Sequence, residues 1–329
     1  MSSDNTQNSR VGHLDLAAGI LMLWVMTFHA VNNAKVFGDV DARVAIPFLT
    51  FSMGWFFYKS GAFFKDGRGM EGIRKDARRL LVPFLKWAAI GYAIHLIMMA
   101  VDGTFDIEHC ILKPLDTFYI YGYIPIDVPI WFLLSLFVVK FISTWLLKWK
   151  IHPVIPIILG FGIASLFHIL NNPRIPYYLA NIPMGLAFFM LGYWLNKYES
   201  KKWLIAVCAA GYFLFLIGDT PVVGLHRNIH LAGNYYLWPV FCYCGIVFFD
   251  NLCKWIRLLL DKWGCDGFRP FSYLGKNSIL LLISHGLIYM TLIHYSRLSP
   301  MATFLIIEAL YLFVLIPAIV VWDKFSGKK

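Results

Sequence analysis

The sequence predicts an all-α integral membrane protein, a bundle of about ten transmembrane helices with both termini in the cytoplasm. Three observations predict it. Of the 329 residues, 59% are hydrophobic and only 15% are charged, whereas a soluble domain is about half apolar and about a quarter charged. The apolar residues form runs long enough to cross a bilayer, and the basic residues are distributed unequally between the connections.

Ten candidate spans follow one another along the chain. A helix needs about 20 predominantly apolar residues to cross a hydrocarbon core of about 30 Å. The expected spans are residues 14–31, 44–64, 80–101, 128–147, 153–170, 177–196, 202–217, 231–250, 270–290 and 301–322. Residues 1–10 are expected to be a polar N-terminal tail, and residues 11–329 a single transmembrane domain.

The basic residues predict the orientation. An even number of spans places both termini on one side of the membrane. Of the 29 Lys and Arg, six fall on the opposite side, namely Lys35, Arg43, Lys113, Arg174, Arg227 and Arg297. The densest basic run, residues 65–79, lies on the side of the termini. Since basic loops stay in the cytoplasm, this side is expected to be cytoplasmic.

The composition also excludes several classes of protein. A disordered chain, a small disulfide scaffold and an ordinary soluble enzyme do not have this apolar content. The net charge of +10 is expected to serve a membrane surface rather than a nucleic acid. The six cysteines lack metal-ligand spacing, so we expect buried apolar thiols, with no disulfide framework and no metal site.

Residues 102–127 are expected to form the longest outer loop. Acidic side chains alternate there with Tyr119, Tyr121 and Tyr123. Carboxylates and aromatic faces suit a neutral, sugar-like ligand through hydrogen bonds and stacking. An interfacial aromatic belt beside a solvated acidic loop explains the same composition, so both interpretations stay open.

Ionisable groups inside the spans divide by depth. Because such groups are costly in a bilayer, each is a candidate functional residue. The outer halves hold His29, His95, His168, His285 and Glu308, and the inner halves hold Lys59, Lys86, Lys140 and Lys276. Lysines near span ends can snorkel to the interface, and an isolated histidine can be a hydrogen-bonded packing residue.

Two of these groups stand out. His29 shares a helix face with Ala18 and Asp15, which lie 11 and 14 residues before it, because both spacings are close to whole numbers of helical turns. Imidazole titrates near neutrality and suits proton removal from a hydroxyl. Lys59 lies between Gly54 and Gly61, in a stretch whose small residues allow close helix contact.

Several motifs occur in a fixed order along the chain. They are residues 14–20 followed by His29, the Phe-Phe-x-x-Ser-Gly-x-x-Phe pattern at 56–64, Arg-Arg-Leu-Leu-Val-Pro-Phe at 78–84, Trp-Phe-Leu at 131–133, and Leu-Gly-Lys-Asn-Ser at 274–278 with His285 beyond it. In these motifs the chain resembles the acyltransferase 3 family of integral membrane O-acyltransferases. It is most similar to the branch of fucose 4-O-acetylase and enterobacterial common antigen O-acetyltransferase.

The resemblance implies a reaction and a set of site residues. The donor is an acyl-CoA, most often acetyl-CoA, and the acceptor is a hydroxyl of a glycan or glycolipid at a bacterial cytoplasmic (inner) membrane. His29 is then the general base, with Asn277, Ser278 and His285 as further catalytic candidates. The candidates for holding the donor are Lys59, Ser60, Arg78, Arg79 and Lys276.

One position departs from the family pattern. At the position of Ala18, before His29 on the same predicted helix, the family usually has Arg or Lys. We expect Lys59, also in an inner half-span, to supply the missing charge. A transporter or flippase, with Pro-interrupted spans and buried polar groups, and a non-catalytic relative of the family remain the alternatives.

Overall fold

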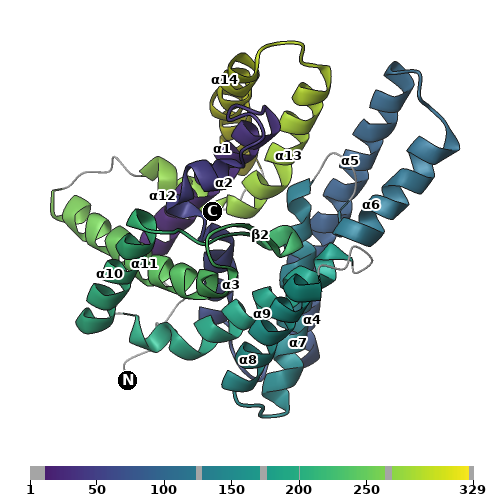
Figure 1. Ribbon diagram of the computed structural model, residues 1–329. Coiled ribbons are helices and arrows are strands. Elements are labelled where there is room, and N and C mark those ends of the chain that lie inside the picture. Colours follow the sequence, from purple (N-terminus) through teal and green to yellow (C-terminus); the bar gives the residue numbers. More distant parts are fainter. Residues whose placement is uncertain (1–11, 124–127, 171–175, 200, 264–268, 326–329) are drawn as a thin grey trace.

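The computed structural model describes residues 12–123, 128–170, 176–199, 201–263 and 269–325, and almost all of them are helical (Figure 1). The first half contains α1 (Gly12–Asn33), α2 (Ala42–Ala45), α3 (Ser52–Ala62), α4 (Gly69–Asp76), α5 (Val82–Val101), α6 (Lys113–Tyr121), α7 (Trp131–Lys148) and α8 (Val154–Leu170). The second half contains α9 (Tyr177–Leu195), α10 (Lys202–Ile217), β1 (Val222–Gly224), β2 (Ile229–Ala232), α11 (Trp238–Lys262), α12 (Arg269–Lys276), α13 (Ser278–Tyr295), α14 (Pro300–Leu310) and α15 (Ile316–Phe325).

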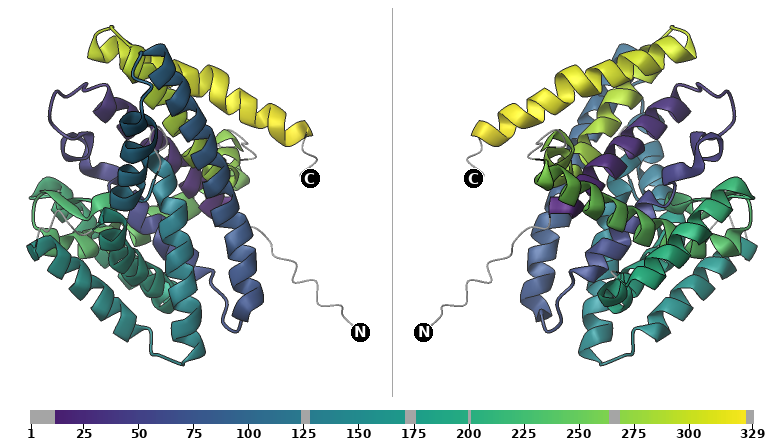
Figure 2. Two further views of the ribbon diagram at one scale, coloured as in Figure 1. Left: turned by 90° about the vertical axis from the view of Figure 1, so that its right-hand side faces the viewer. Right: turned by 90° about the vertical axis from the view of Figure 1, so that its left-hand side faces the viewer.

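Six helical runs in the described part of the chain are long and apolar enough to cross a membrane. They are Gly12–Asn33, Gly69–Val101, Val128–Lys148, Tyr235–Lys262, Ser278–Tyr295 and Pro300–Trp322, and α8 and α10 are shorter apolar helices. The last run lies at the edge of the molecule in Figure 2, and few of its residues are buried. The helical class is therefore confirmed, whereas ten spans and cytoplasmic termini stay predictions.

Four expected ranges need correction. The span 44–64 is interrupted, because Pro47 starts a separate short helix before α3. The span 231–250 begins too early, since its first residues belong to β2. The span 270–290 is two helices, α12 and α13, separated at Asn277. The loop 102–127 contains α6, which begins with Pro114 in its first turn, a position where proline is favoured.

Pairs of glycines bring helices into backbone contact. A Cβ at Gly19 of α1 would lie 1.9 Å from the Phe271 carbonyl oxygen, and one at Gly275 of α12 would lie 1.8 Å from the Asp15 carbonyl oxygen. Gly61 of α3 and Gly192 of α9 form a second reciprocal pair, with corresponding distances of 1.8 and 1.9 Å. No larger residue fits at these crossings, so the glycines fix which helices adjoin.

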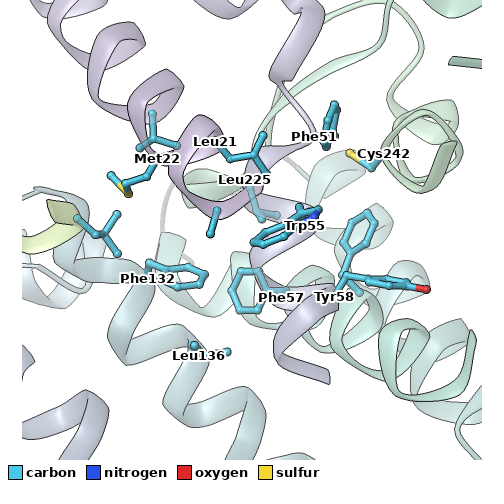
Figure 3. Packing of buried hydrophobic residues seen from close by; sticks show 14 of the residues in the cluster. Leu21, Met22, Phe51, Trp55, Phe57, Tyr58, Phe132, Leu136, Leu225 and Cys242 are labelled. Carbon is cyan, nitrogen blue, oxygen red and sulfur yellow. The ribbon is translucent and has the colours of Figure 1, made fainter. Parts of the chain in front are cut away.

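The buried core is centred on α3. Figure 3 shows Trp55, Phe57 and Tyr58 among side chains from α1, α7 and the segment after β1. The ring of Phe57 contacts that of Phe132 edge-on, with centroids 5.0 Å apart. Phe57 and Tyr58 are fully buried. The short helix predicted as part of a membrane span is therefore enclosed by other helices.

A small antiparallel hairpin interrupts the helical pattern between α10 and α11. Val223 of β1 pairs with His230 of β2, and the two strands are joined by a turn at 225–228. Asn228 ends the turn in the left-handed conformation, at φ 52°. Its side-chain amide donates to the Ala164 carbonyl oxygen, and the Tyr235 hydroxyl donates to its amide oxygen. The hairpin turn is therefore fixed to α8 and to the start of α11.

Candidate functional site

A cavity of about 450 Å³ opens at the C-terminal end of α1. It is called the His29 cavity here. Its walls come from α1, the segment before α3, the hairpin turn after β1, the start of α7 and the middle of α13. The polar groups on its walls are His29, Asn32, Asn33, Asp41, Arg43, Tyr123, Trp131, His226, Arg227 and Tyr289. A volume of this size is in the range that holds small-molecule ligands.

Two further rings adjoin His29 from α13. The ring of Tyr289 is parallel to that of His29 within 5°, with centroids 5.6 Å apart. The ring of His285 lies 5.5 Å from His29. Since all three come from α1 and α13, which pack against each other, the sequence-predicted pair of His29 and His285 is brought together beside the cavity.

The tautomer of His285 follows from its hydrogen bond. Nδ1 lies 2.9 Å from the Leu281 carbonyl oxygen, which can only accept, so Nδ1 carries the proton. In the neutral ring, Nε2 is then an acceptor, and it is buried with no hydrogen-bond partner in the described part of the protein. An unused acceptor nitrogen is costly in a buried site, and the ring that carries it has its centroid 5.5 Å from that of His29.

A bidentate ion pair between Arg43 and Asp41 forms part of the cavity wall. Two nitrogens of Arg43 donate to the two carboxylate oxygens of Asp41, at 2.9 and 2.7 Å. Burial opposes ionisation of Asp41, but these hydrogen bonds and the Arg43 charge outweigh it and hold the pKa at about 2. The guanidinium also lies 5.3 Å from the centre of the Phe28 ring. Asp41 therefore stays ionised and compensates Arg43.

The hairpin turn supplies the opposite wall. His226 adjoins Trp131, with ring centroids 6.3 Å apart, and its backbone carbonyl accepts from Asn181. Burial, together with the charges of Arg43 and Arg227, holds the pKa of His226 well below 6.5, although Asp41 opposes this. His226 is therefore a neutral imidazole on a cationic wall.

A second polar cluster lies away from this cavity. The Lys59 ammonium is 2.6 Å from Glu199 and 2.5 Å from Asp250. The indole nitrogen of Trp55 donates to the other oxygen of Asp250, at 2.6 Å. All three charged side chains are at most 12% exposed. We call Lys59, Glu199, Asp250 and Trp55 the Lys59 cluster.

Comparison with known proteins identifies the family. The family model described as "Acyltransferase domain" matches residues 11–323, nearly the whole chain. The chain belongs to the acyltransferase 3 family. No curated protein and no solved structure matches the chain. Family membership and the apolar helices together indicate a multi-pass membrane protein and support acyltransferase activity.

The other catalytic candidates of this acyltransferase lie elsewhere. Asn277 separates α12 from α13, and its side-chain amide donates to the Tyr273 carbonyl oxygen at 3.3 Å. Ser278 begins α13, seven residues and therefore about 10 Å along the helix from His285. Neither residue lines the His29 cavity. The late motif therefore spans two separate parts of the molecule.

The residues predicted to hold the donor differ in their exposure and in their partners. Arg78, Arg79 and Lys276 are exposed. The Ser60 hydroxyl donates to the Phe56 carbonyl oxygen one turn earlier, at 2.8 Å. Lys59 is buried between two carboxylates, so an incoming phosphate would compete with both. None of the five lines the His29 cavity.

Three of the other ionisable groups predicted inside spans, Lys140, His95 and His168, have local partners. Lys140 contacts the buried Asp76 at 2.7 Å. The ring of His95 donates to the His109 carbonyl oxygen at 2.9 Å, and that of His168 stacks on Tyr235 with centroids 3.9 Å apart. These contacts agree with the packing interpretation of both histidines. The five described cysteines are buried, and Cys265 lies outside the described residues.

Sequence reasoning missed Asp41, His226, Glu199 and Asp250. His226 lies in a segment with no predicted span and no motif. Its position on the cavity wall depends on the hairpin, which the sequence did not predict. Glu199 is 140 residues from Lys59 in sequence. A signal was available for Asp250 alone, because a carboxylate at the end of an apolar run needs a partner.

Proposed function

We propose that the protein is a membrane O-acyltransferase that transfers an acyl group, in particular acetyl, from acyl-CoA to a hydroxyl of a glycan or glycolipid. We place it in a bacterial cytoplasmic membrane with both termini in the cytoplasm. The observation that carries the proposal is the position of His29 on a cavity wall beside His285, in a chain of the acyltransferase 3 family.

His29 is the general base in this proposal. The acceptor hydroxyl binds in the His29 cavity, and its oxygen attacks the thioester carbonyl of the donor. Neutral imidazole accepts the hydroxyl proton as the new ester bond forms. When the carbon–sulfur bond breaks, the CoA thiolate leaves and takes up that proton. Atoms and charge therefore balance without a further reactant.

His285 is a positioning residue for this step. Because its Nδ1 proton is donated to Leu281, the neutral ring offers Nε2 only as an acceptor. It can therefore orient a neighbouring N–H or hydroxyl, but it cannot donate to an oxyanion in this tautomer. Asn277 and Ser278 do not line the His29 cavity, so we assign neither of them to oxyanion stabilisation in this step.

In this proposal, exposed basic side chains bind the phosphates of the acyl-CoA donor. CoA phosphates are bound best by Arg and Lys. Arg78, Arg79 and Lys276 are exposed, and Lys276 directly follows Gly275, whose backbone lies against Asp15 of α1. Lys276 thus adjoins the inner part of α1, where this chain has Ala18. We therefore favour Lys276 over the compensated Lys59 as the replacement for the missing cation.

The test is transfer of radiolabelled acetyl from acetyl-CoA to a membrane glycan pool by the purified protein. His29→Gln is expected to reduce transfer by roughly 10²- to 10⁴-fold, the usual contribution of a general base. His95→Gln is the matched control, because His95 does not line the His29 cavity and its ring donates to the local His109 carbonyl oxygen. Transfer by the His29 variant at the control rate contradicts the assignment. If the wild-type protein neither transfers acetyl nor slowly releases CoA, the result supports a non-catalytic relative of the family instead.

A further inference from the structure

A second cavity, of about 390 Å³, lies between α8, α9 and α11. Six of its ten lining side chains are apolar, and the others are Ser165 and three tyrosines. The hydroxyl of Tyr235, one of the three, already donates to Asn228. Two lining residues, Tyr236 and Val240, are more than half exposed, so the cavity opens on the surface of the bundle. We call it the α9–α11 groove.

The groove is about as long as half a bilayer is thick. It extends along α9 from Met184 to Leu195, a distance of 11 residues and therefore about 16 Å of helix. One leaflet contributes about half of a hydrocarbon core of about 30 Å. The opposite wall, α11, belongs to a helical run that is long and apolar enough to cross a membrane. The groove therefore has the length and the surroundings to hold one lipid acyl chain.

Buried rings join the two walls of the groove. The ring of Phe188 on α9 contacts that of Trp238 on α11 edge-on, with centroids 5.4 Å apart, and both side chains are fully buried. The groove shares no lining residue with the His29 cavity among those that the structure describes. We therefore assign the groove to a resident lipid and not to a substrate of the transfer reaction.

Two lysines lie where α9 ends. Leu191, Leu195 and Tyr198 are spaced four and three residues apart, which keeps them on one helix face. Tyr198 thus continues the face that lines the groove. The ammonium groups of Lys197 and Lys201 lie 5.0 and 4.8 Å from the centre of the Tyr198 ring. Two cations are therefore held on one aromatic ring at the end of the groove.

The acid between these lysines in the sequence, Glu199, is directed elsewhere. Its carboxylate contacts Lys59 at 2.6 Å, and its backbone carbonyl accepts from Asn251 of α11, which ties the end of α9 to α11. Lys197 and Lys201 are both exposed. Two like charges on one ring repel each other, and an anion between them relieves this repulsion. The phosphate of a lipid supplies such a charge, and basic sites between helices at a membrane surface bind anionic headgroups.

We propose that the α9–α11 groove is a phospholipid site. One acyl chain of an anionic phospholipid lies along the groove, and the lipid phosphate is bound by Lys197 and Lys201. The site does not depend on the proposed transfer reaction. Because the lipid contacts α9 and α11 together, its binding stabilises the part of the bundle in which Glu199 meets Lys59.

Native mass spectrometry of the full-length protein in detergent tests the proposal, because it resolves the binding of single lipid molecules. Dioleoyl phosphatidylglycerol, which is anionic, is compared with dioleoyl phosphatidylcholine, which has the same chains and no net charge. The wild type is expected to bind the first phosphatidylglycerol molecule about tenfold more tightly, as two lysines beside an anionic headgroup allow. Equal binding of the two lipids, or binding of neither, overturns the proposal.

Charge variants locate the headgroup. The double variant Lys197→Gln, Lys201→Gln is expected to lose the preference and to bind both lipids as the wild type binds phosphatidylcholine. The double variant Lys148→Gln, Lys150→Gln is the matched control, since Lys148 also lies over a ring, that of Trp145, at 4.6 Å, but outside the groove. A preference that survives the first variant, or that is lost equally in both, contradicts a headgroup site at the end of α9.

A second pair of variants locates the acyl chain. Val240→Trp fills the groove and is expected to abolish the tight binding of phosphatidylglycerol. Val207→Trp is the matched control, because Val207 is an equally exposed valine on α10 outside the groove. Both valines are exposed, so the two variants are expected to unfold at similar temperatures without added lipid. Phosphatidylglycerol that binds Val240→Trp as tightly as the wild type overturns the chain site in the groove.

Discussion

The His29 cavity and the Lys59 cluster are both built from ionisable side chains inside the helical bundle, but they differ in what their polar atoms contact. Lys59 has two carboxylate partners, and Asp250 also accepts from Trp55. Beside the cavity, the buried Nε2 atom of His285, which is not a lining residue, has no hydrogen-bond partner in the described chain. Glu199 Oε1 of the Lys59 cluster lacks such a partner too, but the charges of this cluster compensate one another at ion-pair distance, which favours a structural role. The His29 cavity instead presents polar side chains to a volume that can hold a small ligand.

The largest expected effect tests whether the Lys59 cluster is structural. Lys59→Ala leaves two buried carboxylates without their cation, which typically costs about 3–5 kcal/mol of unfolding free energy. Thermal unfolding in detergent measures this, and loss of transfer is expected only as a result of lost folded protein. The combined variant Lys59→Met, Glu199→Gln, Asp250→Asn is the control, because it removes all three charges and is expected to recover stability. A Lys59→Ala protein that is as stable as the wild type but inactive restores the donor-binding role of Lys59.

A smaller effect is expected from the helix crossing beside the Lys59 cluster. Gly61→Ala places a Cβ against the Phe189 backbone, so α3 and α9 must separate, at a cost of about 1–3 kcal/mol. Gly162→Ala is the matched control, since a Cβ there contacts nothing within 4 Å. It is expected to be neutral or slightly stabilising, because Ala favours a helix over Gly. Equal unfolding temperatures for the two variants contradict the close crossing.

The smallest expected effect is a pH dependence from the cavity wall. The folded-state pKa of His226 lies well below its usual 6.5, so the unfolded chain binds a proton first as pH falls. Stability is therefore fully present above pH 6.5 and declines below it, by at most about 1.4 kcal/mol per pH unit from this residue. His226→Gln is expected to flatten the curve between pH 6.5 and 5. An unchanged slope means that His226 is protonated, or exposed, in the folded protein.

The sequence predicts the cavity better than the cluster. His29 and His285 both belong to motifs on long apolar runs. Helix α1 was expected at nearly its observed range, whereas α13 was expected only as the second part of the longer span 270–290. Their proximity depends only on these two helices packing together. The charges on Arg43 and Arg227 were expected on the outer side, but not in one cavity, because the hairpin that carries Arg227 has no periodic signal.

The partners of Lys59 could not be predicted in the same way. An isolated lysine in an apolar run indicates that some anion is needed. Glu199 follows the short helix 196–198 after α9, and Asp250 lies on α11, both far along the chain. Only the crossing of α3 with α9 and α11 decides which acids reach it. The polar Lys-Asn-Ser triplet at 276–278 indicates a helix break at Asn277. The mean hydropathy of residues 270–290 is high in spite of this triplet, so the range was expected to be one continuous span.

The reciprocal glycine contacts restrict how this bundle can move. Where two backbones touch directly, no side chain can change rotamer to let one helix slide past its neighbour. The crossing of Gly19 with Gly275 therefore holds α1 and α12 at a fixed contact. The chain is not continuous helix just beyond it, because Asn277 interrupts the path from α12 to α13. A movement that keeps α12 in contact with α1 can therefore still tilt α13, and His285 with it, at Asn277.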